Sequence, residues 1–153
     1  MSDQTLAEVT LGHLRAMGIT PAEGPAEDIW TFEAGGAPGA WNCFVWVRQA
    51  EAQVVLHSVA PFGVPAARRE AVALYLTRAN YGLILGNFEF DLDDGELRFK
   101  TSVDVEGTTL AETTMRHLVG VNLKAMDQYL GGALEVIAGT DPATAVAAAE
   151  SAG

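Results

Sequence analysis

The chain has 153 residues, a typical length for a single domain with its own hydrophobic core. Twenty acidic residues against nine basic ones give a net charge of −11, which excludes nucleic-acid binding and disfavours binding to an anionic membrane surface. The only cysteine, Cys43, cannot form an internal disulfide, and we expect it to be a buried, unreactive thiol. No run of about 18 apolar residues and no secretory leader is recognisable, so we expect a cytoplasmic protein that does not span a membrane.

The N-terminal region predicts a helix from about Asp3 to Met17, capped by Ser2 or Asp3. Its apolar residues recur at helical spacing, and Gly18 can supply the left-handed residue that ends such a helix. A loop follows at residues 20–26.

Three strands are predicted next, at residues 29–32, 41–48 and 53–59, and the last two form a hairpin. Both hairpin strands are apolar on both faces. In the first of them, Cys43, Val45 and Val47 point one way, while Phe44 and Trp46 point the other. A solvated sheet face alternates more cleanly between apolar and polar residues. We therefore expect both faces to be covered, one by helices and the other by a second subunit or a bound partner.

A second helix is predicted from Pro65, which suits the first helical position, to a stop at Gly82. The alternation that follows predicts two strands joined by a two-residue turn at Asp94-Gly95. This turn would set three pairs on the apolar face and two on the charged face: Leu92 with Leu97, Phe90 with Phe99, Phe88 with Thr101, Asp91 with Arg98, and Glu89 with Lys100.

The last helix is expected to begin with a capping box from Thr109 to Glu112, and Gly131-Gly132 is expected to break or bend it. We expect residues 1–138 to form one domain and residues 139–153 to be a flexible, alanine-rich tail. The element order α-β-β-β-α-β-β-α predicts an α+β fold, an antiparallel meander with the helices on one side.

The stretches Asn80-Tyr81-Gly82, Gly86 to Phe90 and Asp94 to Phe99 resemble the YbjN-like family, and the last helix is similar to that family's closing helix. The resemblance covers about residues 3–137. It implies a fold like that of type III secretion chaperones. It also implies a bacterial regulator linked to sensory transduction or stress, a small acidic homodimer that binds another protein.

No catalytic or cofactor motif is present in the sequence. A nucleophile elbow, a P-loop and a dinucleotide-binding glycine motif are all missing, and the three histidines and one cysteine lack metal-ligand spacing. We therefore expect no enzyme activity, no cofactor and no metal.

Two groups of residues are candidates for partner binding. Phe44 and Trp46 are either core residues or, if their face is open, the aromatic anchors of an interface. Arg68, Arg69 and Arg78 form the only local basic cluster, which either balances neighbouring acids or docks an acidic segment.

These observations favour a non-enzymatic, homodimeric regulator or chaperone-like adaptor that binds another protein. The alternative is a metabolite sensor with a pocket between the sheet and the last helix, lined by Trp30, Tyr75 and Tyr129.

Overall fold

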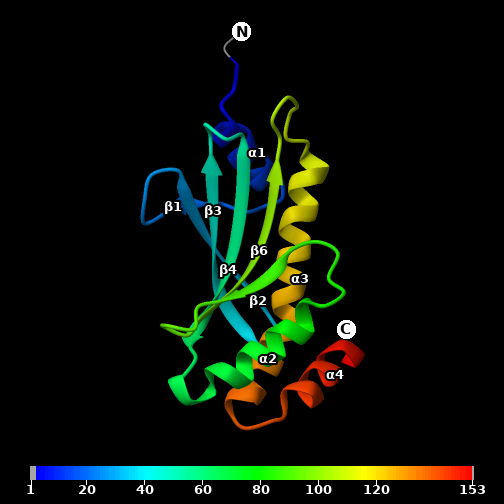
Figure 1. Ribbon diagram of the computed structural model, residues 1–153. Helices are drawn as coiled ribbons and strands as arrows, with labels where there is room; N and C mark the ends of the chain where they lie inside the picture. Colours follow the sequence, from blue (N-terminus) through cyan, green and yellow to red (C-terminus); the bar gives the residue numbers. More distant parts are fainter. Residues whose placement is uncertain (1–2, 153) are drawn as a thin grey trace.

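A six-stranded antiparallel sheet is the central feature of the computed structural model, which describes residues 3–152 (Figure 1). Its strands are β1 (Ala22–Glu23), β2 (Ile29–Gly36), β3 (Gly39–Arg48), β4 (Gln53–Gly63), β5 (Asn87–Phe90) and β6 (Glu96–Asp104). The helices are α1 (Leu6–Ala16), α2 (Arg69–Asn80), α3 (Glu112–Ile137) and α4 (Pro142–Ala152), with a short 3-10 turn η1 (Ala66–Arg68) before α2. The α+β class predicted from the sequence is confirmed.

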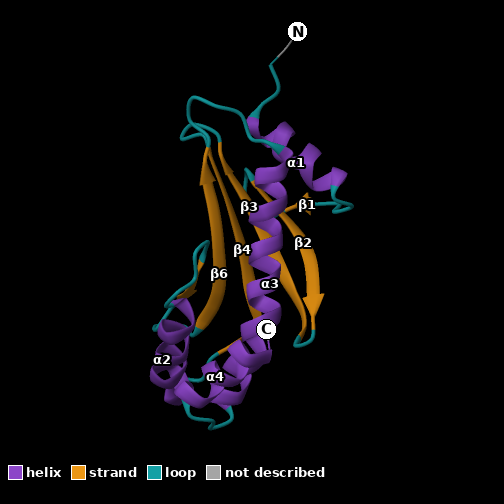
Figure 2. Ribbon diagram, turned by 90° about the vertical axis from the view of Figure 1, so that its right-hand side faces the viewer, coloured by secondary structure: helices purple, strands orange, loops and turns teal. Residues whose placement is uncertain are grey.

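The strand order is β1-β2-β3-β4-β6-β5, so the sheet is a meander except at one place. The second hairpin joins the sheet through β6, which pairs with β4, and β5 becomes the edge strand. All helices lie on one face: α3 runs along β2, β4 and β6, α1 lies at one end, and α2 and α4 pack around the other end of α3 (Figure 2). No element among residues 3–152 covers the opposite face, and none of their helices is long and apolar enough to cross a bilayer.

The core lies between this sheet and α3. Cys43, Val45 and Val47 of β3 point into it, as their alternation predicts, and are almost completely buried. The buried amide of Asn122 on α3 fixes the helix to the sheet, since it donates to the carbonyls of Leu56 and Phe99 and to the hydroxyl of Thr101. The hydrophobic layer is therefore held in register by a polar contact.

Helix α1 begins later than predicted. Thr5 is its N-cap and forms a capping box with Glu8, in which each side chain bonds the other residue's backbone N–H. Asp3 precedes the helix, and Ser2 lies outside the described residues. Helix α3 also begins later than predicted, and its predicted capping box was wrong: Ala111 occupies the N-cap position, and no side chain caps that helix.

The predicted register of the second hairpin was wrong by two residues. The pairs are Phe88 with Phe99, Glu89 with Arg98, and Phe90 with Leu97, so one face stays apolar and the other charged. Leu92, predicted to pair with Leu97, instead lies in the connection and is exposed. The connection is wider than a two-residue turn, since the N–H of Asp91 bonds the carbonyl of Glu96, while Gly95 donates to the carbonyl of Asp91. The side chain of Asp91 accepts from the N–H of Asp93 and stabilises this wider loop.

Gly131 and Gly132 do not break α3, which continues to Ile137. A Cβ added to Gly132 would collide with the hydroxyl oxygen of Tyr75, which donates a hydrogen bond to the carbonyl of Tyr129. Gly132 is therefore needed because α2 approaches α3 closely at this point.

The C-terminal region also differs from the expectation of a flexible tail. Residues Pro142–Ala152 form α4, which packs against α2 and α3 and buries Ala145 and Val146. Asp141 accepts a hydrogen bond from the N–H of Thr144 and so caps this helix. The small alanine side chains let α4 lie close to its neighbours.

Candidate functional site

The uncovered face of the sheet carries a band of apolar side chains, which we call the open face. Cross-strand pairing aligns Ile29, Trp46 and Val55 in one row across β2, β3 and β4. The next row contains Phe44 and His57 and continues to Lys100 on β6. Trp46 is 40% exposed, in contrast to its buried neighbours on β3. The prediction that this face is apolar is confirmed, but helices cover only the other face.

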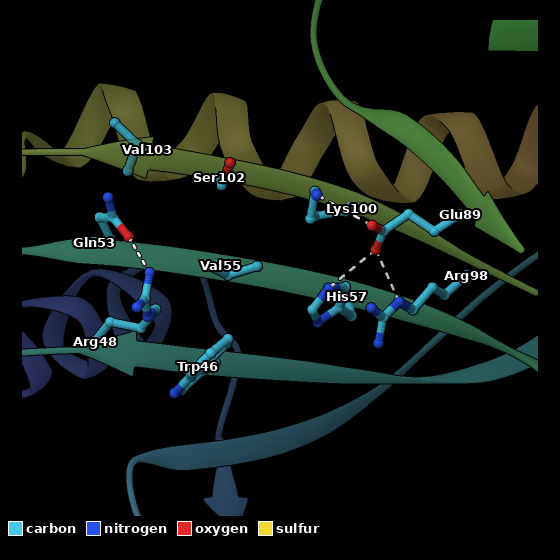
Figure 3. A pocket seen from close by; sticks show the side chains of 10 residues that line it. All are labelled: Trp46, Arg48, Gln53, Val55, His57, Glu89, Arg98, Lys100, Ser102 and Val103. Atoms are coloured by element: carbon cyan, nitrogen blue, oxygen red, sulfur yellow. Dashed lines mark hydrogen bonds and ion pairs between the residues drawn. The ribbon is translucent and has the colours of Figure 1, made fainter. Parts of the chain in front are cut away.

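A group of charged side chains lies beside this band (Figure 3). Glu89 of the edge strand accepts a hydrogen bond from the Nε of Arg98 at 2.9 Å and from the Nζ of Lys100 at 3.2 Å. The Nε2 of His57 lies 3.5 Å from the same carboxylate. These groups are brought together because β4, β6 and β5 are neighbours in the sheet.

The surroundings of this group shift two pKa values. Burial, followed by the positive charge of Arg98, lowers the pKa of His57 despite the opposing effect of Glu89, so the imidazole is neutral near pH 7. Partial burial alone would raise the pKa of Glu89, but the bond from Lys100 and the charge of Arg98 outweigh it and lower that pKa. Glu89 is therefore an anion between two cations at neutral pH.

Arg48 extends the site beyond Trp46. Its guanidinium carbon lies 5.0 Å from the centre of the Trp46 ring, within the range of a cation–π contact. It also donates to the amide oxygen of Gln53, whose nitrogen in turn bonds Asp104 at 2.9 Å. The polar contacts hold Arg48 beside the exposed aromatic ring.

These side chains enclose a shallow hollow of about 330 Å³ on the open face. Three of the nine basic residues of the chain line it, namely Arg48, Arg98 and Lys100, but only one of its twenty acidic residues does, Glu89. The hollow is therefore a cationic and aromatic region on an acidic protein.

The structure separates the two groups of residues that the sequence suggested. Phe44 and Trp46 lie together on the open face. In contrast, Arg68 donates to the carbonyl of Val136, and Arg69 donates to the carbonyls of Val64, Leu92 and Asp93. These two arginines therefore connect loops and helices of the chain itself, which favours a structural role for them over docking of an acidic segment. The third residue of that cluster, Arg78, is exposed on α2.

A second exposed surface lies on α2 and the loop after it. Leu74 is exposed on the outer face of the helix, and Arg78 follows one turn later on the same face. Tyr81, the C-cap residue, and Ile84 and Leu85 in the loop are also exposed. Four large apolar side chains are thus exposed within twelve residues.

The sensor pocket suggested by the sequence is filled by side chains. Tyr75 and Tyr129 are buried core residues, and Tyr129 packs edge-on against Phe88 with ring centres 5.6 Å apart. Trp30, Tyr75 and Tyr129 do not line the hollow on the open face.

Other reactive side chains have structural contacts. Burial raises the pKa of the Cys43 thiol to about 11, and the hydrogen bonds with Ser58 and Trp41 only partly offset this effect. His13 bonds the carbonyl of Leu110 at 2.8 Å. Among residues 3–152, no three His, Cys, Asp or Glu side chains are grouped so that they could hold a metal ion.

Sequence reasoning missed the contribution of β6 to the site. It predicted that Glu89 would face Lys100 but treated this pair as part of a solvated hairpin. The signal that could have located the cluster was His57, a polar residue between Val55 and Val59 on an apolar face, because it needs polar neighbours on the adjacent strand.

Comparison with known proteins places this geometry in context. The profile of the YbjN family, described as "Putative bacterial sensory transduction regulator", matches residues 11–134. The fold is similar to the crystal structure of YbjN from E. coli, "a putative transcription regulator", with a TM-score of 0.59 and 11% identity over 88% of this chain and 92% of that one.

It is also similar to the HopA1–SchA chaperone–effector complex, with a TM-score of 0.54 and 11% identity over 79% of this chain and 90% of that one. No curated protein matches the sequence significantly. At this level of identity, the likenesses to solved structures establish the fold.

Proposed function

The chain belongs to the YbjN family, and from this membership we propose that it is a non-enzymatic cytoplasmic regulator that binds another protein as a chaperone-like adaptor. The open face is the observation that carries the proposal, because it leaves Trp46 and its apolar row uncovered by any described helix. Tryptophan and arginine are the residues most enriched at the energetic centre of protein interfaces, and here Arg48 lies beside Trp46. The similar fold found in a chaperone–effector complex supports the same conclusion.

The edge of the sheet next to the open face offers backbone groups to a partner. Strand β1 pairs only with Trp30 and Thr31 of β2, so the outer edge of β2 from Phe32 to Gly36 has no strand beside it among residues 3–152. An extended segment could add a strand at such an edge and place side chains on the open face. Backbone pairing and the aromatic anchor would then act together.

The test is affinity co-purification of the tagged full chain from its native host, with Trp46→Asp beside it. Leu134→Asp is a matched control, because Leu134 on α3 is also 40% exposed but lies away from the open face. We expect one stoichiometric protein with the wild type and with the control, and its loss with Trp46→Asp, whose circular dichroism should be unchanged. Retention of that protein by a folded Trp46→Asp variant would exclude the open face as the binding surface.

We also propose that the protein is a homodimer formed through the outer face of α2. An antiparallel pairing of two α2 helices centred on Leu74 would set Glu70 of one copy opposite Arg78 of the other, twice by symmetry. The exposed side chains of Leu74 and Tyr81 would be buried in the same contact. Light scattering coupled to gel filtration measures the oligomeric state. We expect a dimer for the wild type and a monomer for Leu74→Asp. A wild type that is monomeric at about 100 µM, far above the Kd of a stable dimer, would refute the proposed dimer.

A further inference from the structure

The hollow beside Trp46 carries a charge of opposite sign to that of the whole protein. A chain with a net charge of −11 has three of its nine basic residues in the hollow beside Trp46 and one of its twenty acidic residues there. Such a local excess of positive charge stabilises an anionic group of a partner and disfavours a cationic one.

The two cations next to Glu89 still have donors to offer. A guanidinium has five N–H groups and an ammonium three, whereas Glu89 accepts only from the Nε of Arg98 and from one position on Lys100. Among residues 3–152, no hydrogen bond uses the Nη atoms of Arg98, whose Nη1 has only a long ion pair to Glu96 at 3.9 Å. The side chains of Arg98 and Lys100 are 38% and 33% exposed. A carboxylate that approaches the open face can therefore bond both residues without displacing Glu89.

The sheet also fixes the distance between these cations and the apolar anchor. Trp46 pairs with Val55 and Val55 with Ser102, so Lys100 lies two strands and two residues away from Trp46. Strand spacings of about 4.8 Å and a rise of about 3.4 Å per residue place the two positions roughly 12 Å apart. An extended peptide covers that distance in three or four residues.

We propose, resting on the proposed function, that the open face binds an extended segment of another protein that carries an acidic residue three or four positions from an aromatic or aliphatic one. The apolar side chain covers Trp46 and Val55, and the carboxylate reaches Lys100 and Arg98. The partner is recognised by this combination of apolar contact and negative charge.

Synthetic 12-residue peptides with a fluorescein label test the proposal directly. Each contains one Phe and one Glu in a Gly/Ser background, at separations of one to eight residues, and anisotropy is measured against the full-length chain at up to about 1 mM. We expect the tightest binding at a separation of three or four, weakened about fivefold when Gln replaces the peptide's Glu. The Lys100→Glu variant should instead prefer peptides with Lys in place of Glu, whereas Lys124→Glu, the same charge change on the exposed surface of α3, should behave as the wild type.

Three results would overturn the proposal: equal binding at all separations, equal binding of Glu and Gln peptides, or no binding of any peptide at 1 mM. None of them decides the proposed function. A partner that co-purifies with the wild type and is lost with Trp46→Asp would still establish an adaptor, with a different recognition chemistry.

Discussion

Glu89 holds Arg98 and Lys100 in place, and its negative charge also repels an incoming partner carboxylate. The substitution Glu89→Gln keeps the shape of the side chain and removes its charge. It weakens two ion pairs, at 2.9 and 3.2 Å, between groups that are each about one-third exposed. Exposed pairs contribute about 0.2–1 kcal/mol each, so we expect the free energy of unfolding to fall by about 1 kcal/mol and the Tm by about 2–4 °C.

The same substitution should strengthen binding. With Glu89 neutral, this repulsion is removed, and we expect the Glu-containing peptide to bind about threefold to fivefold more tightly. Urea unfolding and peptide anisotropy at pH 7 measure the two effects on one preparation. Glu96→Gln is the matched control, since Glu96 is 3.9 Å from Arg98, and it should change stability by less than about 0.5 kcal/mol.

The pH dependence gives an independent check on the stability effect. Because the folded state lowers the pKa of Glu89, the ionised form contributes stability above the unfolded pKa of about 4.5, and this contribution is lost as the pH falls through the folded pKa. The difference between the wild type and Glu89→Gln should therefore be full at pH 7 and shrink in acid. A variant that is less stable and also binds the acidic peptide less tightly would refute the reasoning, since it would show that Glu89 organises the site for its partner.

Three other predictions concern the fold and its electrostatics. Because the folded state lowers the pKa of His57, the free energy of unfolding should decrease as the pH falls below about 6.5. His57→Asn should reduce this pH dependence in urea titrations from pH 5 to 8. An unchanged pH dependence would exclude His57 as its source. Asn122→Ala removes hydrogen bonds between α3 and the sheet and leaves a cavity, so its free energy of unfolding in urea should be lower by about 2–4 kcal/mol. The control Asn42→Ala, at an exposed position, should lower it by less than about 0.5 kcal/mol. Gly132→Ala should destabilise the protein because its Cβ would meet the hydroxyl of Tyr75. In a double-mutant cycle measured by thermal unfolding, adding Tyr75→Phe should restore part of the lost stability. Additive effects of the two substitutions on stability would count against the contact.

Local patterns were sufficient for the first hairpin. Strict alternation places Val45 and Val47 inside and Phe44 and Trp46 outside. The short connection between β3 and β4 leaves little freedom of register. In the second hairpin the alternation is equally clear, but the acidic loop can close in more than one way. The Asx turn at Asp91 favours the wider connection, and this choice moves the register by two residues. The apolar and charged faces keep their character, but Leu92 leaves the strand and is exposed.

The missed helix has a different cause. Only Ala145 and Val146 of α4 are buried, and their small side chains produce no apolar stripe that a sequence pattern could detect. The start signal was nevertheless present, since Asp141 and Pro142 are an acidic N-cap and a first-position proline. The packing partners of this helix, α2 and α3, become evident only in three dimensions.

The arrangement of the candidate site depends on which strand of the second hairpin meets β4, and the sequence contains one clue to that choice. The side chain of Asn80, at the end of α2, accepts from the N–H of Phe88 and donates to its carbonyl, as a neighbouring strand would. Asn80 thus occupies the outer backbone groups of β5 at Phe88 and leaves β6 to pair with β4. Lys100 and Arg98 are brought beside His57 as a result. Because β5 is closed at this point while the β2 edge from Phe32 to Gly36 has no strand beside it among residues 3–152, a partner that adds a strand is directed to the β2 side of the sheet.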